Sequence, residues 1–277
     1  MITSDLVKKS VDYIMKHLDE AISVEDVARH CHFSKYHFCR IFKLETGESP
    51  YAFIKRLRME QSAVRLKLEK DKLITDIGED FGYSSSNFSS AFKKQLNRSP
   101  AEFRQDAEAE TIPNPFRPDN CVSFRSFEEY DRQIQIKELD DFVVIFERHL
   151  GNYDKLEEYW NQFWIKYRDF ITEDTLFIEK FYDDPSITGV EQCLFDLCMT
   201  VDSNCSLDNV AIIPGGHYAV YRFEGLIQDI FTDLQGVFKI WLAESRYEMR
   251  GRYGLDIYRK MDIENRYVVM DLCIPVK

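Results

Sequence analysis

Several features that would place this sequence in a common class of protein are missing from it. No apolar run approaches the ~20 residues that a membrane-spanning helix requires. Residues 1–20 mix acids, lysines and apolar side chains, unlike a signal peptide. We therefore expect a cytoplasmic protein without membrane contact.

The sequence also lacks the usual signs of catalysis and metal binding. Its seven cysteines are odd in number and scattered, without the C-x-x-C spacing of zinc or redox sites, so free thiols in a reducing compartment are expected. A Gly-rich phosphate loop and a cluster of metal ligands are missing as well. We therefore expect no catalytic residues, no metal and no cofactor, and a protein that is not an enzyme.

The charge is distributed unevenly along the chain. Its 277 residues are enough for two domains, and a net charge of −12 would argue against a nucleic-acid partner. However, residues 1–105 carry 18 Lys and Arg against 15 Asp and Glu, whereas residues 106–277 carry 18 against 33. This asymmetry is expected when only the first domain contacts DNA.

A repeat with a spacing of 50 residues occupies the first part of the chain. Apolar positions coincide between the two copies, which indicates that one supersecondary unit occurs twice. The identical pairs are Asp26 with Asp76, Ser34 with Ser84, Phe38 with Phe88, Phe42 with Phe92, Lys43 with Lys93, Ser49 with Ser99, Pro50 with Pro100 and Phe53 with Phe103.

Each copy is predicted to form a helix, a tight turn and a second helix, starting near Val24 and near Ile74. Ser34 and Ser84 are the expected N-caps of the second helices. Between the copies, Ser49 and Pro50 begin a helix running to about Lys70, which at 1.5 Å per residue spans roughly 30 Å, close to one DNA turn. The exposed faces are predicted to carry Lys35, Tyr36, Cys39, Arg40 and Lys43 in the first copy and Ser85, Ser86, Ser89, Ser90 and Lys93 in the second.

The segments HFSKYHFCRIFKLETGESP and DIGEDFGYSSSNFSSAFKKQLNRSPAEFR resemble the paired helix-turn-helix domain of AraC/XylS regulators over about residues 5–105. The resemblance implies base contacts from Tyr36, Cys39 and Arg40, with Arg40 suited to a guanine. The second turn looks one residue shorter than is usual in that family, and its helix carries short serines. We therefore expect the first helix to specify the sequence and the second mainly to anchor the protein.

Residues 106–120, DAEAETIPNPFRPDN, are rich in proline and acids and predict a linker. The expected domains are a DNA-binding domain at 1–107, a linker at 108–120 and a second domain at 121–277. In the second domain, the pattern β-α-β-β occurs twice, with helices expected over Tyr153–Phe170 and Leu226–Ala243.

The segments FYDDPSITGVEQCLFDLCMTV, IPGGHYAVYRFEG, WLAESRY and DLCIPV resemble the GyrI-like domains of Rob-type regulators. The resemblance implies a pocket between the two repeats for apolar, often cationic, small molecules. Aromatic residues are also abundant here, 27 of 39 following residue 105, and rings with a carboxylate suit an organic cation. The candidate ligand-binding residues are Trp160, Trp164, Tyr182, Phe195, Tyr221, Trp241, Tyr258 and, as counter-charge, Asp271, with Asp196 and Glu224 as alternatives to Asp271.

The expected fold is α+β, with an all-α paired helix-turn-helix domain followed by a duplicated βαββ GyrI-like effector domain. The expected function is a sequence-specific transcription regulator, by resemblance an activator, that binds double-stranded DNA and responds to a small-molecule effector. RNA polymerase is an expected partner, and either a monomer or a homodimer fits. Two alternatives remain for the second domain, a hydrolase that uses a carboxylate and a tyrosine, and a protein-interaction module.

Overall fold

The computed structural model describes residues 2, 4–109, 111–151 and 153–277 of the chain. It divides into two compact units, Met1–Ala109 and Glu110–Lys277. Unit 1 is helical, whereas unit 2 is built on a large antiparallel sheet with helices, so the predicted α+β class is confirmed. Among the described residues, no helix is long and apolar enough to cross a membrane.

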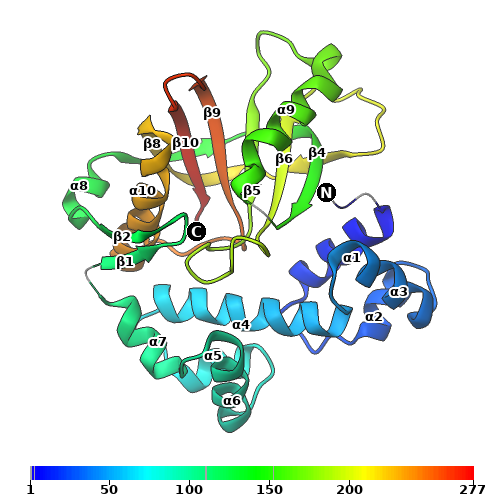
Figure 1. Cartoon of the computed structure of the whole chain (residues 1–277), viewed down its shortest axis with the longest axis vertical. Helices are drawn as coiled ribbons and strands as arrows, with labels where there is room; N and C mark the ends of the chain where they lie inside the picture. Colours follow the sequence, from blue (N-terminus) through cyan, green and yellow to red (C-terminus); the bar gives the residue numbers. More distant parts are fainter. Residues whose placement is uncertain (1, 3, 110, 152) are drawn as a thin grey trace. The chain divides into compact units, whose positions relative to one another are not determined.

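Unit 1 contains the two predicted helix-turn-helix motifs (Figure 1). Their first helices begin at Val24 and Ile74, as the repeat predicts. The two turns, residues 31–34 and 81–84, have the same length, so the second turn is not shortened relative to the first. The helices of unit 1 are α1 (Asp5–Lys16), α2 (Val24–His30), α3 (Lys35–Thr46), α4 (Pro50–Leu68), α5 (Ile74–Asp80), α6 (Ser85–Leu96) and α7 (Pro100–Ala107).

The second helix of each motif buries the predicted apolar face but is capped differently. Ser34 accepts a hydrogen bond from the His37 N–H at 3.4 Å, which satisfies one of the free amides at the start of α3. Ser84 occupies the same position before α6 without such a side-chain bond. The fully buried phenylalanines of these faces are Phe38, Phe42, Phe88 and Phe92.

The helix predicted between the motifs is confirmed as α4. Ser49 accepts a hydrogen bond from the Ala52 N–H at 3.2 Å, and Pro50 takes the first helical position, where its missing N–H is not needed. The 19 residues of α4 span about 29 Å at 1.5 Å per residue.

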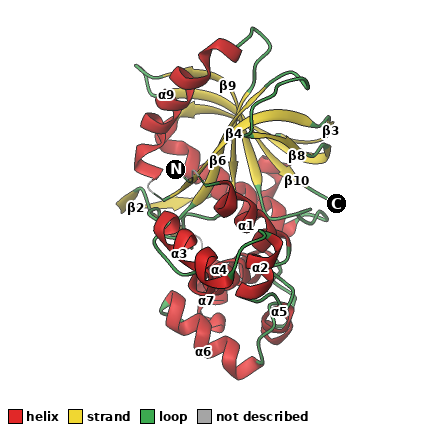
Figure 2. Ribbon diagram, turned by 90° about the vertical axis from the view of Figure 1, so that its right-hand side faces the viewer, coloured by secondary structure: helices red, strands yellow, loops and turns green. Residues whose placement is uncertain are grey.

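Unit 2 carries an eight-stranded sheet in the described residues, in the order β3-β8-β10-β9-β5-β6-β4-β7 (Figure 2). Two βαββ repeats, β4-α9-β5-β6 and β8-α10-β9-β10, meet where β5 pairs with β9, so the predicted duplication is confirmed. The strands are β3 (Ile134–Leu139), β4 (Phe142–Leu150), β5 (Phe177–Phe181), β6 (Leu194–Thr200), β7 (Val210–Ile213), β8 (Gly216–Leu226), β9 (Gly254–Asp262) and β10 (Tyr267–Pro275).

Each predicted helix of the repeats is present as a chain of shorter helical segments. The first consists of η1 (Tyr153–Lys155), α9 (Leu156–Tyr167) and η2 (Arg168–Phe170). The second consists of η3 (Ile227–Asp229), α10 (Ile230–Gly236) and the π-helical η4 (Val237–Leu242).

The segment predicted as a linker, residues 108–120, contributes instead to a hairpin of β1 (Thr111–Asn114) and β2 (Arg117–Ser123). Proline is tolerated in this hairpin because both strands of a two-stranded ribbon are edge strands, where an N–H that faces solvent is not needed for pairing. The composition of the segment therefore gives no sign of the two strands. The Asn114 side chain accepts a hydrogen bond from the Phe116 N–H at 2.9 Å and closes the turn. A short helix, α8 (Phe127–Asp131), follows the hairpin and was likewise not predicted.

Both repeat helices cover the same face of the sheet. Trp160 of α9 contacts Phe177 of β5, and Phe238 of η4 contacts Phe181 of β5, with ring centroids 6.1 and 6.2 Å apart. Residues 177 and 181 point to the same side because side chains alternate along a strand. We call this side the helix face and the other side the open face.

Candidate functional site

The first helix-turn-helix motif presents several polar side chains to solvent on α3. Tyr36 is 83% exposed, Arg40 and Lys43 are exposed, and Cys39 is half-buried. Lys35 is exposed but forms an ion pair with Glu25 on α2. Arg40 forms no ion pair with any residue that the structure describes, so its guanidinium is available to a ligand.

The second motif presents a face of different chemistry on α6. The four predicted serines and Lys93 are all exposed. Asn87, which was not predicted as a DNA-binding residue, is exposed on the same helix, and its amide can donate and accept hydrogen bonds. The exposed serines of this face are Ser85, Ser86, Ser89 and Ser90.

In unit 2, the helix face brings three predicted ligand-binding residues to one region. The rings of Trp160 and Tyr258 meet edge to face at 5.5 Å. Phe195 on β6 lies 4.7 Å from the ring of Tyr153 in η1. Two of these aromatic residues bond to Glu179 of β5, which accepts a hydrogen bond from the Tyr153 hydroxyl at 2.5 Å and one from the Tyr258 hydroxyl at 3.0 Å.

A second carboxyl group lies beside Glu179. Asp256 on β9 is its register partner, and facing side chains on neighbouring antiparallel strands have Cβ atoms about 5 Å apart. Glu179 and Asp256 are only 2% and 5% exposed. We call Tyr153, Trp160, Glu179, Asp256 and Tyr258 the Glu179 site.

The Glu179 site is unusual in having buried acids without a basic partner among the described residues. Burial raises the pKa of Glu179, and burial together with the charge of Glu179 raises the pKa of Asp256 well above its usual range. The nearby imidazole of His149 is uncharged, because burial lowers its pKa to about 4. Four other buried carboxylates of unit 2 do form ion pairs, namely Glu147 with Lys166, Asp196 with Arg148, Asp233 with Arg125, and Asp271 with Arg222 and Arg259.

The structure places the other predicted ligand-binding residues away from the Glu179 site. Asp271 precedes Leu272, the register partner of Asp256, and therefore lies on the open face. Tyr182 donates a hydrogen bond to Asp196 at 2.6 Å on that same face. Trp164 is 52% exposed on α9.

The two remaining aromatic candidates pack against α8 under the second repeat. Tyr221 contacts the ring of Tyr130 at 6.0 Å. The Trp241 indole donates a hydrogen bond to Asp131 at 2.9 Å. Of the two alternatives to Asp271, Asp196 is paired with Arg148, and Glu224 accepts a hydrogen bond from Tyr267 at 2.6 Å.

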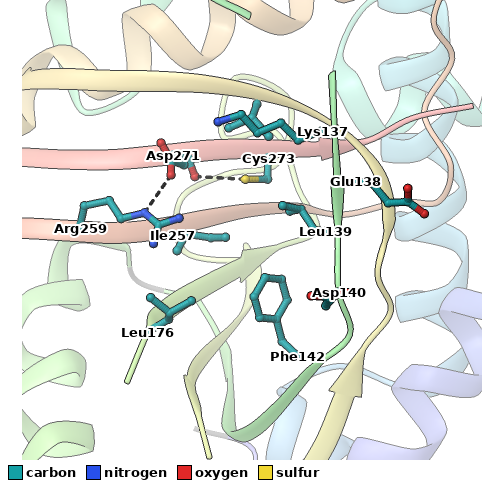
Figure 3. Close-up of a pocket in the computed structure, with 11 residues that line it drawn as sticks. Lys137, Glu138, Leu139, Asp140, Phe142, Leu176, Ile257, Arg259, Asp271 and Cys273 are labelled. Atoms are coloured by element: carbon teal, nitrogen blue, oxygen red, sulfur yellow. Dashed lines mark hydrogen bonds and ion pairs between the residues drawn. The ribbon is translucent and has the colours of Figure 1, made fainter. Parts of the chain in front are cut away.

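A cavity of about 250 Å³ opens on the other side of the sheet and is lined by Asp271 (Figure 3). Figure 3 shows Arg259 reaching the Asp271 carboxylate above apolar side chains that include Phe142 and Leu139. Because Arg222 also pairs with Asp271, the buried negative charge of this cavity is already neutralised. The cavity is therefore a poorer match to an organic cation than the Glu179 site.

The hairpin that replaces the predicted linker reaches the Glu179 site. Phe116, at its turn, lies 6.1 Å from the ring of Tyr153 and 5.8 Å from the ring of Phe231 on α10, edge to face in both cases. The hairpin turn thus packs between helical segments of the two repeats. It contacts Tyr153, whose hydroxyl donates a hydrogen bond to Glu179.

Sequence reasoning missed Glu179, Asp256 and Tyr153. The signal that could have found the two acids is the alternation of side chains along a strand. In FIEKF, Glu179 points to the same side as the two phenylalanines, and in GLDIY, Asp256 points to the same side as the tyrosine. Single acids on strands are usually exposed, so this signal becomes specific only when the two strands are known to be adjacent.

Comparisons with known proteins agree with this architecture. Residues 27–106 match a helix-turn-helix domain, and residues 132–277, more than half of the chain, match a GyrI-like small molecule binding domain. Transcriptional regulator Rob from Salmonella typhimurium is 25% identical over 94% of this chain and 91% of its own length. Regulatory protein SoxS from the same organism is 28% identical over 38% of this chain and 97% of its own length.

Two solved structures each resemble a part of the chain. The C-terminal domain of AraT, a response regulator from Geobacillus stearothermophilus, is 33% identical and covers 37% of this chain and 86% of its own, with a TM-score of 0.36. The EcmrR C-terminal domain is 11% identical and covers 52% of this chain and 97% of its own, with a TM-score of 0.45. The chain belongs to the GyrI-like family and is an AraC-type regulator whose helix-turn-helix domain precedes the small molecule binding domain.

Proposed function

We propose that this regulator is a transcription activator that binds a specific DNA site through unit 1 and a lipophilic organic cation through unit 2. The observation that carries the proposal is the Glu179 site, a buried carboxyl pair without a basic partner among the described residues. A buried carboxylate is stable only when an opposite charge pairs with it or a proton neutralises it. In the Glu179 site, a cationic ligand can provide the opposite charge.

On the DNA side, the two motifs are proposed to contribute unequally. Arg40 carries a free guanidinium that can make paired hydrogen bonds to N7 and O6 of a guanine. The α6 serines are short, which suits phosphate contacts or recognition of DNA shape. Because both recognition helices belong to one chain, a monomer can occupy a full site, and activation then requires contact with RNA polymerase.

On the effector side, the aromatic rings and acids of the Glu179 site complement a cation with apolar substituents. Ring faces and edges attract such a ligand through their quadrupoles, and a desolvated cation gains more from them than a hydrated one. The Tyr153 and Tyr258 hydroxyls each donate a hydrogen bond to the Glu179 carboxylate and so orient it.

The DNA part is tested by selecting bound sequences from random duplexes with the wild type and with Arg40→Ala. We expect the variant to lose preference at one base pair, since a good bidentate contact contributes about 1–3 kcal/mol of discrimination. Lys43→Ala is the matched control and should weaken binding to all sequences similarly. An unchanged preference in Arg40→Ala would remove Arg40 from base recognition.

The effector part is tested by thermal shift with tetraphenylphosphonium and, as an uncharged comparator, triphenylphosphine oxide. We expect stabilisation by the cation only, because a ligand that binds the native state raises its stability by mass action. Glu179→Gln should abolish the shift, whereas Glu138→Gln, an exposed acid of the same unit, should keep it. Equal shifts with both compounds would contradict a site selective for cations.

One observation favours hydrolysis as a second candidate function. The Tyr153 hydroxyl and the Glu179 carboxylate are 2.5 Å apart, which is the kind of carboxylate–tyrosine pair that a hydrolase could use. Mass spectrometry of the ligand after long incubation separates the two functions. An effector is recovered intact, whereas a substrate is converted to products whose masses add up to that of the substrate plus one water.

A further inference from the structure

Resting on the proposed function, we propose that the Glu179 site takes up its organic cation in exchange for a proton, so that effector affinity rises with pH. The proton leaves Asp256 for solvent as the cation enters, so the total charge of the site is unchanged. The regulator would then respond to cation concentration and to pH together.

The geometry places two acids side by side in an apolar layer. Glu179 lies between Leu197 of β6 and Asp256 of β9, and Asp256 in turn pairs in register with Leu272 of β10. Leu197 and Leu272 are fully buried. Neither neighbouring strand therefore supplies a polar group at this level of the sheet.

The groups that face the acid pair are all uncharged at neutral pH. Tyr153 comes from η1 and Tyr258 from β9, and burial raises the pKa of both hydroxyls. Trp160 comes from α9, and the thiol of Cys193 lies near Tyr153. No Lys or Arg of the described chain forms an ion pair with Glu179 or Asp256.

The two acids differ in how they are hydrogen-bonded. Glu179 accepts bonds from two hydroxyls, at 2.5 and 3.0 Å, and such donors favour its ionised form. The Oδ1 atom of Asp256 is buried and has no hydrogen-bond partner among the described residues. A single proton shared by Glu179 and Asp256 therefore resides on Asp256, because no described donor stabilises a negative charge at its Oδ1 atom.

Electrostatics then links the cation to the proton. Glu179 and Asp256 face each other on neighbouring strands and out of water, so the two carboxylates cannot both be ionised without a counter-charge, as in paired carboxyls that share one proton. A bound cation supplies the counter-charge and lowers the free energy of the doubly ionised pair. The proton on Asp256 is released as a consequence, and linkage requires that a higher pH favours binding.

This coupling also defines the class of effector. A permanently charged cation, such as a quaternary phosphonium or ammonium, draws no proton from solvent, so its binding shows the full release. A weakly basic amine that picks up a proton as it binds would cancel the release. Net proton exchange is therefore specific to permanent and strongly basic cations.

The experiment is calorimetric titration of the whole protein with tetraphenylphosphonium near neutral pH, in phosphate and in Tris. These buffers differ in ionisation enthalpy, so the difference in heat gives the number of protons released. We expect about one proton per ligand for the wild type, none for Asp256→Asn, and an unchanged number for the exposed-acid control Glu138→Gln.

A second measurement needs no variant, so it remains decisive if Asp256→Asn fails to fold. The wild-type affinity for tetraphenylphosphonium should rise about tenfold per pH unit below the pKa of the pair. Binding without proton release and with pH-independent affinity would overturn the exchange but leave the proposed effector class standing. Absence of binding at every pH would overturn both.

Discussion

Replacing Asp256 by Asn is expected to stabilise unit 2 at neutral pH, which is the reverse of most substitutions in a buried layer. In the folded protein, burial and the neighbouring Glu179 raise the pKa of Asp256 well above its usual range. In the unfolded chain, the same carboxyl ionises freely with a pKa near 3.9. The wild type must therefore hold a proton that the unfolded chain has released.

The sign and the size of the effect follow from linkage. Because the pKa of Asp256 is raised in the folded state, its full contribution to the free energy of unfolding is present below the unfolded pKa. This contribution is lost as the pH rises towards the folded pKa. Each retained proton costs about 1.4 kcal/mol per pH unit in that window. Asn cannot ionise, so the advantage of Asp256→Asn should grow by roughly 3 kcal/mol between about pH 5 and pH 7.

Urea unfolding followed by tryptophan fluorescence measures this effect in the whole chain. All three tryptophans, Trp160, Trp164 and Trp241, belong to unit 2, so the signal reports on that unit. The contrasting variant is Asp196→Asn on the open face. Burial opposes ionisation of Asp196, but its pairing with Arg148 lowers the pKa overall, so this stabilisation is present above the unfolded pKa and is lost in acid.

The two variants should therefore show opposite pH dependence. Asp196→Asn should destabilise unit 2 most at neutral pH, by about 3–5 kcal/mol, because it leaves a buried guanidinium unpaired. The reasoning would be refuted if the stability difference between Asp256→Asn and the wild type did not change with pH. It would also be refuted if Asp256→Asn became less stable relative to the wild type as the pH rises.

Two further predictions concern packing. Gly78→Ala would place a Cβ 2.8 Å from the Phe88 ring, so we expect about 1–3 kcal/mol of destabilisation, seen as a lower melting temperature of the helical signal in circular dichroism. An unchanged melting temperature would mean that Phe88 moves freely. Phe116→Ala should destabilise unit 2 by about 1–3 kcal/mol through the loss of two edge-to-face contacts, measured by the tryptophan signal in urea. No change would show that the hairpin turn does not hold the Glu179 site.

The helical unit was predictable because its signals are local. Ser49 and Pro50 mark a helix start by chemistry that operates within four residues, and the repeat doubles the evidence for each boundary. Phe38 and Phe42 report one helical face by their spacing alone. The exposed positions of α3 and α6 follow directly from the same spacing, which is why the surfaces were found together with the fold.

The candidate ligand site in unit 2 was less predictable because it depends on pairing between distant strands. Trp160 and Tyr258 are 98 positions apart in the sequence and meet only because the two repeats join at β5 and β9. From the sequence, Asp271 is the predicted counter-charge to a cation. Its two arginine partners come from neighbouring strands and cannot be assigned to it from sequence.

The hairpin of residues 111–123 was missed for another reason. Its composition is typical of a linker, and the contacts of Phe116 that hold it come from η1 and α10, both distant in sequence.

The buried acids of unit 2 are neutralised in two different ways. On the open face, Asp196 and Asp271 are neutralised permanently by arginines, which fixes their charge and leaves no role for a ligand. On the helix face, Glu147 is paired with Lys166, whereas Glu179 and Asp256 have no basic partner among the described residues and can be neutralised by a proton or by a bound cation. A permanent ion pair at this position would have removed the responsiveness that a regulator requires, since the free energy gained on neutralising the pair would already have been realised during folding. The proposed sensing role of the Glu179 site therefore rests on the absence of a basic partner among the described residues.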